Sequence, residues 1–426
     1  MNDRISIAPT RADCSDIEPI HYRKARRELA RSRSGYALEQ AFYTDADLYR
    51  LDIKAVFHND WVFVANGCEI PQPGDYLTLT IDKAPLIVLR DQDGQLRAFH
   101  NSCRHRGSRI CEHKKGHTNR LVCPYHQWTY DLNGELLATR YMAQDFDARR
   151  FPLKPVQLET LHGMIYICLA ETPPDFNHFR DSISSYIAPH QPERTKVVYE
   201  STIIEEANWK LVIENNRECY HCSGNHPELL ISLVEMALPD DDRNGEEFEI
   251  MQQKAQRWDQ LGLPHAPVDG GREFRCIRLP FRQGIKSMTL DGELGCKKLL
   301  GELTEEDLGS VRAFRIPNNW HHFLSDHILH FRVLPLGPDR TEVRTTWLVH
   351  EDAIEGWDYD PERLSTVWRA TNDQDRKLAE ENHRGICSPG YEPGPYSEVA
   401  EFMAINFTDW YRAKLSEFLQ RPQDQE

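Results

Sequence analysis

Two short segments of the chain each combine a cysteine with a histidine. Cys103 is followed by His105, and 17 residues later Cys123 is followed by His126. Thiolates and imidazoles at such spacing suit zinc or iron–sulfur chemistry. A zinc finger groups its cysteines before its histidines. Here each segment offers one of each, which favours two irons, one held by both cysteines and the other by both histidines. We therefore predict a [2Fe–2S] cluster on these four residues.

Other residues near these segments have weaker claims as ligands. Cys111, His113 and His117 lie between the two pairs but form no paired pattern, so we do not assign them to the cluster. We expect Trp128 and Pro124 to cover the cluster and limit the access of solvent.

A second group of metal-capable residues lies about 100 positions further on, where four residues separate His221 from His226. On an unbroken helix, a step of five residues turns two side chains about 140° apart, too far for one metal. Gly224-Asn225 and Pro227 favour a break, because the residue before a proline avoids helical geometry. We predict a helix over residues 209–223 that breaks there, so that both imidazoles can reach one metal.

Two histidines and a carboxylate on one face of iron(II) leave positions open for oxygen. The sequence around the histidines does not supply an obvious third ligand. Glu218 lies three residues before His221, on the same face of the predicted helix, and we expect it to support that ligand rather than bind the metal. Cys219 and Cys222 match a redox Cys-x-x-Cys pattern, but without a βαβ context we expect no redox role.

The segment CRHRG…CPYHQWTYDLNG resembles the signature of Rieske-type non-haem iron oxygenases. Respiratory Rieske proteins differ in carrying an additional disulfide and no second iron. The segment TNDQDRKLAEENHRG resembles the late helix that supplies the carboxylate in the oxygenases, which implies Asp375 as the third ligand. Asp373 is the nearest competitor, but it lies on a different helix face. The resemblance also implies that Glu218 bridges the iron to a cluster histidine across a subunit boundary.

The resemblance is closest to glycine betaine monooxygenases and stachydrine demethylases, through ENNRECYHCSGNHPELL, SMTLDGELG and YEPGPYSEV. It implies an oxygenase component, dependent on O2 and NAD(P)H, that N-demethylates glycine betaine to dimethylglycine and formaldehyde. Two alternatives stay open: a stachydrine (proline betaine) demethylase and the alpha subunit of an aromatic-ring hydroxylating dioxygenase. A non-catalytic electron carrier would not need His221, His226 and Asp375.

The implied reaction needs partners and a particular pocket. No segment resembles a flavin or nicotinamide site, so we expect a separate reductase carrying flavin and an iron–sulfur cluster, and the resemblance implies a homotrimer. A trimethylammonium group needs aromatic faces and its carboxylate needs a donor such as arginine. Trp320, His322 and Phe323 are candidate lining residues.

The elements that must position these residues fall into three regions. We expect an N-terminal helical arm over 1–45, a small antiparallel β Rieske domain over 46–170 and a catalytic domain over 171–426 with an antiparallel sheet flanked by helices, an α+β fold. Asp93-Gly94 and Asn133-Gly134 predict tight hairpins in the β domain. In the catalytic domain we expect an exposed loop around Pro239, a helix over 363–382 and a closing amphipathic helix with a polar tail.

Composition excludes several other classes. The net charge is −16, which disfavours binding to nucleic acids or anionic membranes. The 11 cysteines are scattered along 426 residues, unlike a disulfide scaffold. No apolar run suggests a membrane span or a secretion signal, so we expect a cytoplasmic protein.

Overall fold

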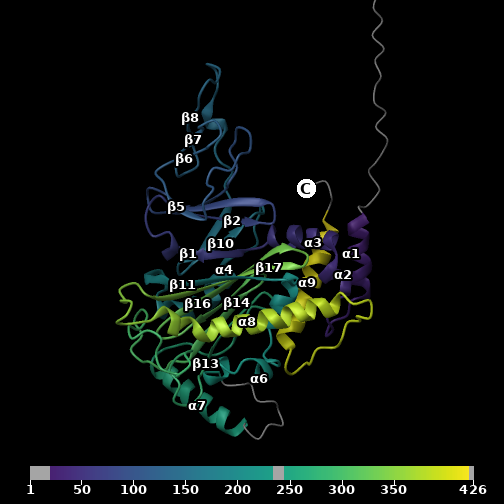
Figure 1. The fold of residues 1–426 in the computed structure, drawn as a ribbon, viewed down its shortest axis with the longest axis vertical. Helices are drawn as coiled ribbons and strands as arrows, with labels where there is room; N and C mark the ends of the chain where they lie inside the picture. Colours follow the sequence, from purple (N-terminus) through teal and green to yellow (C-terminus); the bar gives the residue numbers. More distant parts are fainter. Residues whose placement is uncertain (1–19, 234–243, 422–426) are drawn as a thin grey trace, which may run out of the picture.

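The computed structural model describes residues 20–233 and 244–421. Figure 1 shows a smaller region of short strands standing on a larger region built around one long sheet, with helices beside it. The predicted α+β class, with antiparallel sheets in both regions, is confirmed.

The smaller region contains three antiparallel sheets with the strand orders β4-β3-β2-β5, β6-β7-β8 and β1-β10-β9. Its strands are β1(Val62–Asn66), β2(Asp75–Ile81), β3(Ala84–Arg90), β4(Leu96–His100), β5(Lys115–His117), β6(Leu121–Val122), β7(Thr129–Tyr130), β8(Leu136–Ala138), β9(Gln157–Leu161) and β10(Met164–Cys168). Both predicted hairpins form, and Gly94 and Gly134 adopt the positive φ that such turns require. These hairpins fix the loops that carry the predicted cluster residues.

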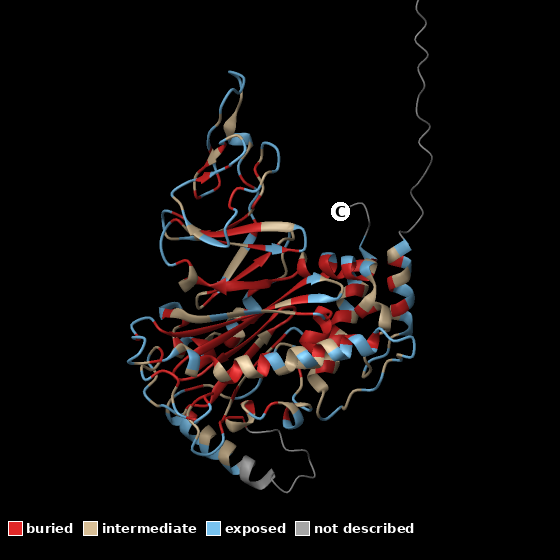
Figure 2. Ribbon diagram, in the orientation of Figure 1, coloured by how far each residue is buried: buried red, intermediate tan, exposed pale blue. Residues whose placement is uncertain are grey.

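The larger region is organised by a seven-stranded antiparallel sheet with the order β11-β17-β16-β15-β14-β13-β12. Its strands are β11(Thr195–Glu205), β12(Val268–Asp269), β13(Phe274–Leu279), β14(Ser310–Arg315), β15(Asn319–Phe323), β16(Ile328–Gly337) and β17(Arg340–His350). Figure 2 shows that most of these strands are buried. A sheet covered on both sides is a rigid support for side chains that project from either face.

Side chains alternate between the two faces of this sheet. One face, which we call the α4 face, packs Phe323, Ile328 and Leu348 into a core with helix α4(Asn177–Ile187) and with the strands β1 and β10. The opposite face, which we call the α8 face, carries Trp320, Phe331 and Trp347, and it packs against α5(Trp209–Asn216) and α8(Pro361–Ile386). The predicted metal ligands come from the segments that cover the α8 face.

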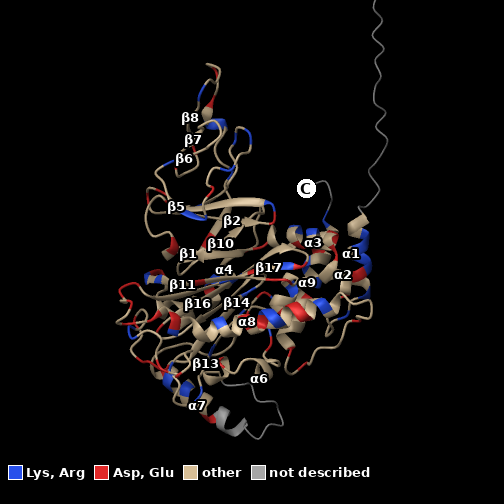
Figure 3. Ribbon diagram, in the orientation of Figure 1, with Lys and Arg blue, Asp and Glu red and all other residues tan. Residues whose placement is uncertain are grey.

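The remaining helices are α1(Ile20–Arg31), α2(Gln40–Thr44), α3(Ala46–Asp52), α6(Cys222–Asn225), α7(Asn244–Gln260) and α9(Phe402–Gln420). Helix α1 lies beside α9, where Tyr22 and Phe418 have ring centroids 6.2 Å apart. In Figure 3 much of the α1 ribbon has the colour of lysine and arginine. The described part of the N-terminal segment is therefore packed against the C-terminal helix.

Two further expectations can be compared with the structure. Residues 234–243 of the loop expected around Pro239 lie outside the described residues, but α7 begins at Asn244, so the end of that segment is helical rather than loop. The closing helix α9 is present, and the polar tail after Arg421 lies outside the described residues. Among residues 20–233 and 244–421 no helix is long and apolar enough to cross a membrane.

Candidate iron–sulfur and iron centres

Two similar turns carry the four predicted cluster residues. In the first, the Cys103 carbonyl accepts a hydrogen bond of 2.9 Å from the Gly107 amide, and in the second the Cys123 carbonyl accepts one of 3.0 Å from the Gln127 amide. Gly107 and Gln127 both have positive φ, which closes each turn tightly. Each turn therefore holds its cysteine and its histidine close together.

The side chains of the two turns meet. The rings of His105 and His126 lie 4.6 Å apart and nearly perpendicular. Both thiols are buried, and burial, with a smaller effect of the adjacent Cys103, raises the pKa of Cys123. Nδ1 of His126 is buried and has no hydrogen-bond partner among the described residues. Two adjacent thiols, two imidazoles and an unpaired ring nitrogen fit the donor set of a [2Fe–2S] cluster.

Of the two residues that we expected to cover the cluster, Trp128 is buried beside the turns and Pro124 is not. Trp128 is buried and stacks on His105, with ring centroids 4.9 Å apart, whereas Pro124 is exposed. Sequence reasoning missed Tyr130, whose hydroxyl lies 3.4 Å from the Cys103 sulfur. Tyr130 follows Trp128 by two residues, the strand period, which places both on one side of the strand. A hydrogen bond to a ligand sulfur is one way in which a protein tunes the cluster potential.

The helix predicted over residues 209–223 ends earlier than expected. Helix α5 ends at Asn216, residues 217–221 form a turn, and the short helix α6 starts at Cys222. Asparagine is a poor helix former, and the Glu218 carboxylate accepts hydrogen bonds from the backbone amides of Tyr220 and His221. Glu218 and His221 therefore meet across a turn, and the prediction that they share a helix face was wrong.

Helix α6 ends at Asn225, directly before His226 and Pro227, so a break does occur between the two histidines. His226 has φ −122° and ψ 63°, outside helical geometry. The Nε2 atoms of His221 and His226 lie 3.0 Å apart. The two imidazoles converge as a shared metal requires.

Asp375 on α8 completes this group. Its Oδ1 lies 3.0 Å from Nε2 of His226 and 3.3 Å from Nε2 of His221. Ligand atoms at right angles around a metal, with bonds of about 2.1 Å, are separated by about 3 Å. Asp375 Oδ1 is also buried without a hydrogen bond of good geometry among the described residues. Asp373, the competitor, points away, with a side chain that is 66% exposed and paired with Arg376.

Each imidazole is held through its other nitrogen. Nδ1 of His221 donates to Glu218 Oε1 at 2.5 Å, and Nδ1 of His226 donates to Gln374 Oε1 at 2.8 Å. Gln374 in turn donates to Glu228 at 2.8 Å. Sequence reasoning missed Gln374, although it directly precedes Asp375. These contacts fix the ring tautomers that leave both Nε2 atoms free for a metal.

The charges of this group favour a cation at its centre. Burial opposes a charged imidazole, but the adjacent carboxylates of Asp375 and Glu218 prevail and raise the pKa of His221 to about 9. Burial likewise opposes the ionised Asp375, yet the two imidazoles hold the pKa of that carboxyl below its ordinary value. Without metal, a proton therefore supplies the positive charge that iron(II) would bring.

A disulfide links Cys219 to Cys222 across His221, with a Cα–Cα distance of 5.0 Å. The Cys-x-x-Cys pattern that we set aside thus forms a bond in the structure. Ligand atoms of His221, Cys222 and His226 lie within 4.8 Å of one another. Because the Cys222 sulfur is bonded to Cys219, we regard Asp375 as the third donor.

The predicted lining residues divide between the two sheet faces. Trp320 and His322 lie on the α8 face, and His322 packs against Trp368 with ring centroids 4.8 Å apart. Phe323 lies on the α4 face, in the core with Val311 and Ile328, so it cannot line a pocket at the iron. Residues of a strand alternate in direction, and this separates Phe323 from His322.

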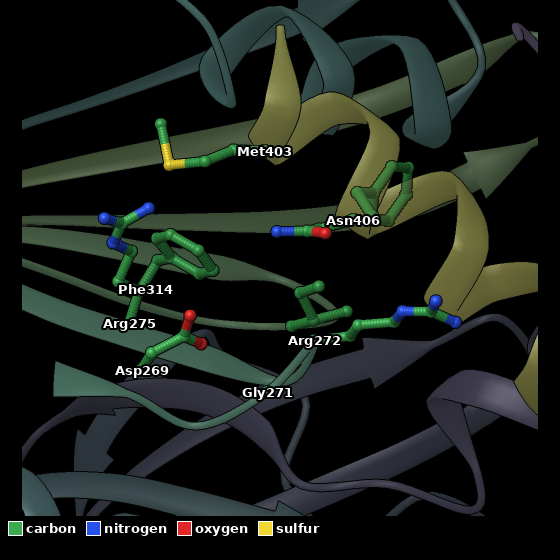
Figure 4. Close-up of a pocket in the computed structure, with 9 residues that line it drawn as sticks. Asp269, Gly271, Arg272, Arg275, Phe314, Met403 and Asn406 are labelled. Carbon is green, nitrogen blue, oxygen red and sulfur yellow. The ribbon is translucent and has the colours of Figure 1, made fainter. Parts of the chain in front are cut away.

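Figure 4 shows a pocket on the α8 face, between the strands β12 to β14 and the start of α9. Phe314 and Arg275, which are cross-strand neighbours, lie on one side of it, and Met403 and Asn406 lie on the other. None of the predicted metal ligands lines it. We therefore place the reaction elsewhere on this face, at the converging histidines.

Comparison with known proteins agrees with this geometry. Residues 60–159 match the Rieske [2Fe-2S] domain family, and residues 192–417 match the ring hydroxylating alpha subunit (catalytic domain) family. The chain is 49% identical to the glycine betaine monooxygenase oxygenase subunit of Pseudomonas aeruginosa PAO1, over 94% of this chain and 93% of that protein. It is also 49% identical to the corresponding subunit of Chromohalobacter salexigens, over 91% of this chain and 88% of that protein.

Among solved structures, a quaternary ammonium Rieske monooxygenase in complex with L-carnitine shares the fold, with a TM-score of 0.69 and 20% identity over 91% of this chain and 97% of that one. The two matching domain families span both predicted centres, and the identity to the oxygenase subunits extends over nearly the whole chain. The chain belongs to the Rieske non-haem iron oxygenases, as an oxygenase alpha subunit related to those of glycine betaine monooxygenases.

Proposed function

We propose that this protein N-demethylates a quaternary ammonium substrate, with glycine betaine as the preferred one. The observation that carries this proposal is the 49% identity, over nearly the full length, to glycine betaine monooxygenase oxygenase subunits. The convergence of His221, His226 and Asp375 supports it, because a protein that only carried electrons would not need this group.

The reaction consumes one betaine, one O2, two electrons and two protons, and it yields dimethylglycine, formaldehyde and water. The cluster, when bound, supplies electrons one at a time, and the iron activates oxygen. Cys103, His105, Cys123 and His126 would hold the cluster, and the two histidines with Asp375 would hold the iron on one face.

Residues around the iron orient its histidine ligands and exclude water. Glu218 keeps a proton on Nδ1 of His221, so that Nε2 presents its lone pair to the metal. Gln374 does the same for His226 without adding charge. The aromatic rings of Trp320, Phe331 and Trp368 are buried and pack against one another, which keeps water away. The two tryptophans would contact a trimethylammonium group through their rings.

The electrons would come from a separate reductase that carries flavin and an iron–sulfur cluster and uses NADH or NADPH. The two matching domain families cover residues 60–159 and 192–417. A cytoplasmic location, where these nicotinamides are available, remains a prediction.

We further propose a homotrimer in which the cluster of one subunit serves the iron of its neighbour. The strands β6 to β8 beside the cluster turns and the helix α6 beside the iron group lie at opposite ends of the molecule in Figure 1. Exposed apolar side chains surround the cluster turns, namely Val122, Tyr125, Leu137, Tyr141 and Met142. Tyr220 is exposed beside Glu218. Contact between these two surfaces would bring Glu218 to a cluster histidine of the next subunit.

A mixing experiment tests this assembly. Cys123→Ser lacks the cluster and Asp375→Asn lacks an iron ligand, so each variant alone should be inactive. Trimers formed from both chains should regain activity if electrons cross between subunits. No recovery in mixed trimers of verified composition would contradict the bridge through Glu218.

Formaldehyde release, measured with a surrogate reductase, tests the substrate. Glycine betaine, stachydrine, choline and carnitine should be compared at equal concentration. A preference for stachydrine would indicate that this protein is a proline betaine demethylase. Turnover of naphthalene without formaldehyde from any ammonium compound would overturn the proposal in favour of an aromatic-ring dioxygenase.

A further inference from the structure

Arg312 in β14 carries a charge without a counter-ion. Its Nε is buried, and among residues 20–233 and 244–421 that Nε has no hydrogen-bond partner and no carboxylate forms an ion pair with the guanidinium. Burial lowers the pKa of Arg312 to about 10, and no neighbouring acid opposes that effect. A partly buried charge without a counter-ion costs folding free energy, so an arginine of this kind suits an anionic partner that binds from outside.

The first link from Arg312 to the iron group runs along its own strand. Phe314 follows Arg312 by two residues and therefore points to the same α8 face. The Arg217 guanidinium lies 3.9 Å from the centre of the Phe314 ring. Arg217 directly precedes Glu218 and lies four residues before His221, so the turn that carries the iron ligand is next to this part of β14.

A second link runs across the sheet. Arg312 is the cross-strand partner of His322, whose ring lies 4.8 Å from that of Trp368. Trp368 is seven residues before Asp375 on α8, about two helical turns and about 10 Å along the same side of the helix. One link starts near His221 and the other at Asp375. Both lead to the part of the α8 face that holds Arg312.

Other polar nitrogens at this place are unpaired as well. Nε1 of Trp320, Nδ1 of His322 and Nε2 of His327 are buried and have no hydrogen-bond partner in residues 20–233 and 244–421. Burial lowers the pKa of His322, and the proximity of Arg312 and His327 lowers it further, so the three side chains are close to one another. A group of potential donors with no acceptor suits an anion with two oxygens.

Arg217, a fully buried guanidinium near the iron group, is less suited to this role, although its Nε is also unpaired among the described residues. It donates to the Asn216 side chain and to the Asn319 carbonyl, and it stacks on Phe314.

The part of the α8 face that holds Arg312 is also less covered than the opposite face. Ile277, Arg312 and Phe314 are half-buried, whereas their strand neighbours on the α4 face are buried.

We propose that Arg312 binds the carboxylate of the substrate and so selects betaines over quaternary ammonium alcohols. The proposal rests on the proposed function and specifies one contact for it. The indole rings of Trp320 and Trp368, which pack against Phe331 with ring centroids 4.9 and 4.8 Å apart, would contact the trimethylammonium group beside that carboxylate. In glycine betaine a single methylene separates the two charges, which suits an arginine close to the aromatic rings.

The test compares glycine betaine with choline, which has the same cation but no carboxylate, in the trimeric iron-loaded protein. Arg312→Gln should raise the KM for betaine by about 30-fold or more, the effect of a lost charge-assisted pair, with a smaller change in kcat. The KM for choline should change less than about threefold. Arg312→Lys should recover part of the betaine affinity. Arg275→Gln, a neighbouring arginine on the same face, should leave both substrates unaffected.

The outcomes separate this inference from the proposed function. Calorimetric binding of betaine, without a reductase, shows whether the carboxylate contact exists even if turnover is absent. If the wild type binds betaine but releases no formaldehyde, the proposed function fails and the Arg312 contact is still tested by the variants. If the wild type demethylates betaine and Arg312→Gln keeps its KM, or if betaine and choline weaken equally, the Arg312 proposal is overturned.

Discussion

Glu218 Oε1 accepts the Nδ1 proton of His221 at 2.5 Å although the two residues are not on one helix. The turn that joins them is held by the same carboxylate, whose second oxygen accepts the backbone amide of Tyr220. The Glu218 carboxylate thus stabilises the turn and also fixes the orientation of the His221 imidazole. A substitution at Glu218 should therefore affect the metal site before it affects the rest of the fold.

Replacing Glu218 tests this relationship. Glu218→Gln removes the charge but keeps an acceptor, and we expect the affinity for iron(II) to fall about 10-fold, with about 100-fold for Glu218→Ala. Calorimetry on the metal-free protein would measure both. Glu206→Gln, an exposed carboxylate paired with Arg340, is the matched control and should have no effect. Unchanged iron affinity in Glu218→Ala would contradict the role given to this residue.

The raised pKa of His221 predicts a pH dependence of metal binding. Below pH about 9 the metal-free imidazole carries a proton that iron(II) must displace, so affinity should rise up to tenfold per pH unit between pH 6.5 and about 8.5. Calorimetry in buffers of different ionisation enthalpy would count the released protons. Iron affinity that does not change across this range would show that His221 is neutral without metal.

The raised pKa of His221 also makes the stability of the metal-free protein depend on pH. A histidine whose pKa is raised in the folded state stabilises fully below its unfolded pKa of about 6.5. That contribution is lost as pH rises through about 9. The melting temperature of the metal-free protein should therefore fall over this range more than that of the iron-loaded protein. A parallel decline of both would contradict this assignment.

Asp375 and Asp373 make a matched pair for identifying the third ligand. Asp375 Oδ1 lies 3.0 Å from His226 Nε2, whereas Asp373 is exposed and pairs with Arg376. Asp375→Asn should abolish stoichiometric iron binding and activity, and Asp373→Asn should retain both. Metal analysis after gel filtration provides the measurement. Loss of iron in Asp373→Asn alone would reverse the assignment.

Local sequence predicted some features of the site well and others poorly. The alternation of cysteine and histidine was sufficient to indicate a cluster, because the ligand order reflects which iron each residue serves. The early end of α5 was missed, because the contact from Glu218 to the Tyr220 amide competes with the helix and depends on a side-chain conformation. The misplacement of Phe323 could have been avoided. Phe323 lies three positions after Trp320, and an odd number of steps along a strand places a side chain on the opposite face of the sheet.

Long-range relationships could not be obtained from the sequence. Asp375 lies more than 140 positions from His226, and it was identified through resemblance rather than through spacing. The partner of His226, Gln374, follows only once the position of α8 over the sheet is known. The unpaired state of Arg312 depends on which strands flank β14, and no local pattern reveals that register.

The cluster assignment separates ligands from neighbouring cysteines and histidines. Cys123 lies in a turn whose histidine ring is within 4.6 Å of that of His105, whereas His117 pairs with Asp75 at 2.9 Å and the buried Cys111 belongs to the core of the small region. Cys123→Ser should therefore remove the visible Rieske absorption and the electron paramagnetic resonance signal of the reduced protein. Cys111→Ala and His117→Ala should retain both, because neither residue belongs to the two turns. Loss of the signal in His117→Ala with a normal melting temperature would mean that the cluster uses a histidine from β5 instead of one from the turns.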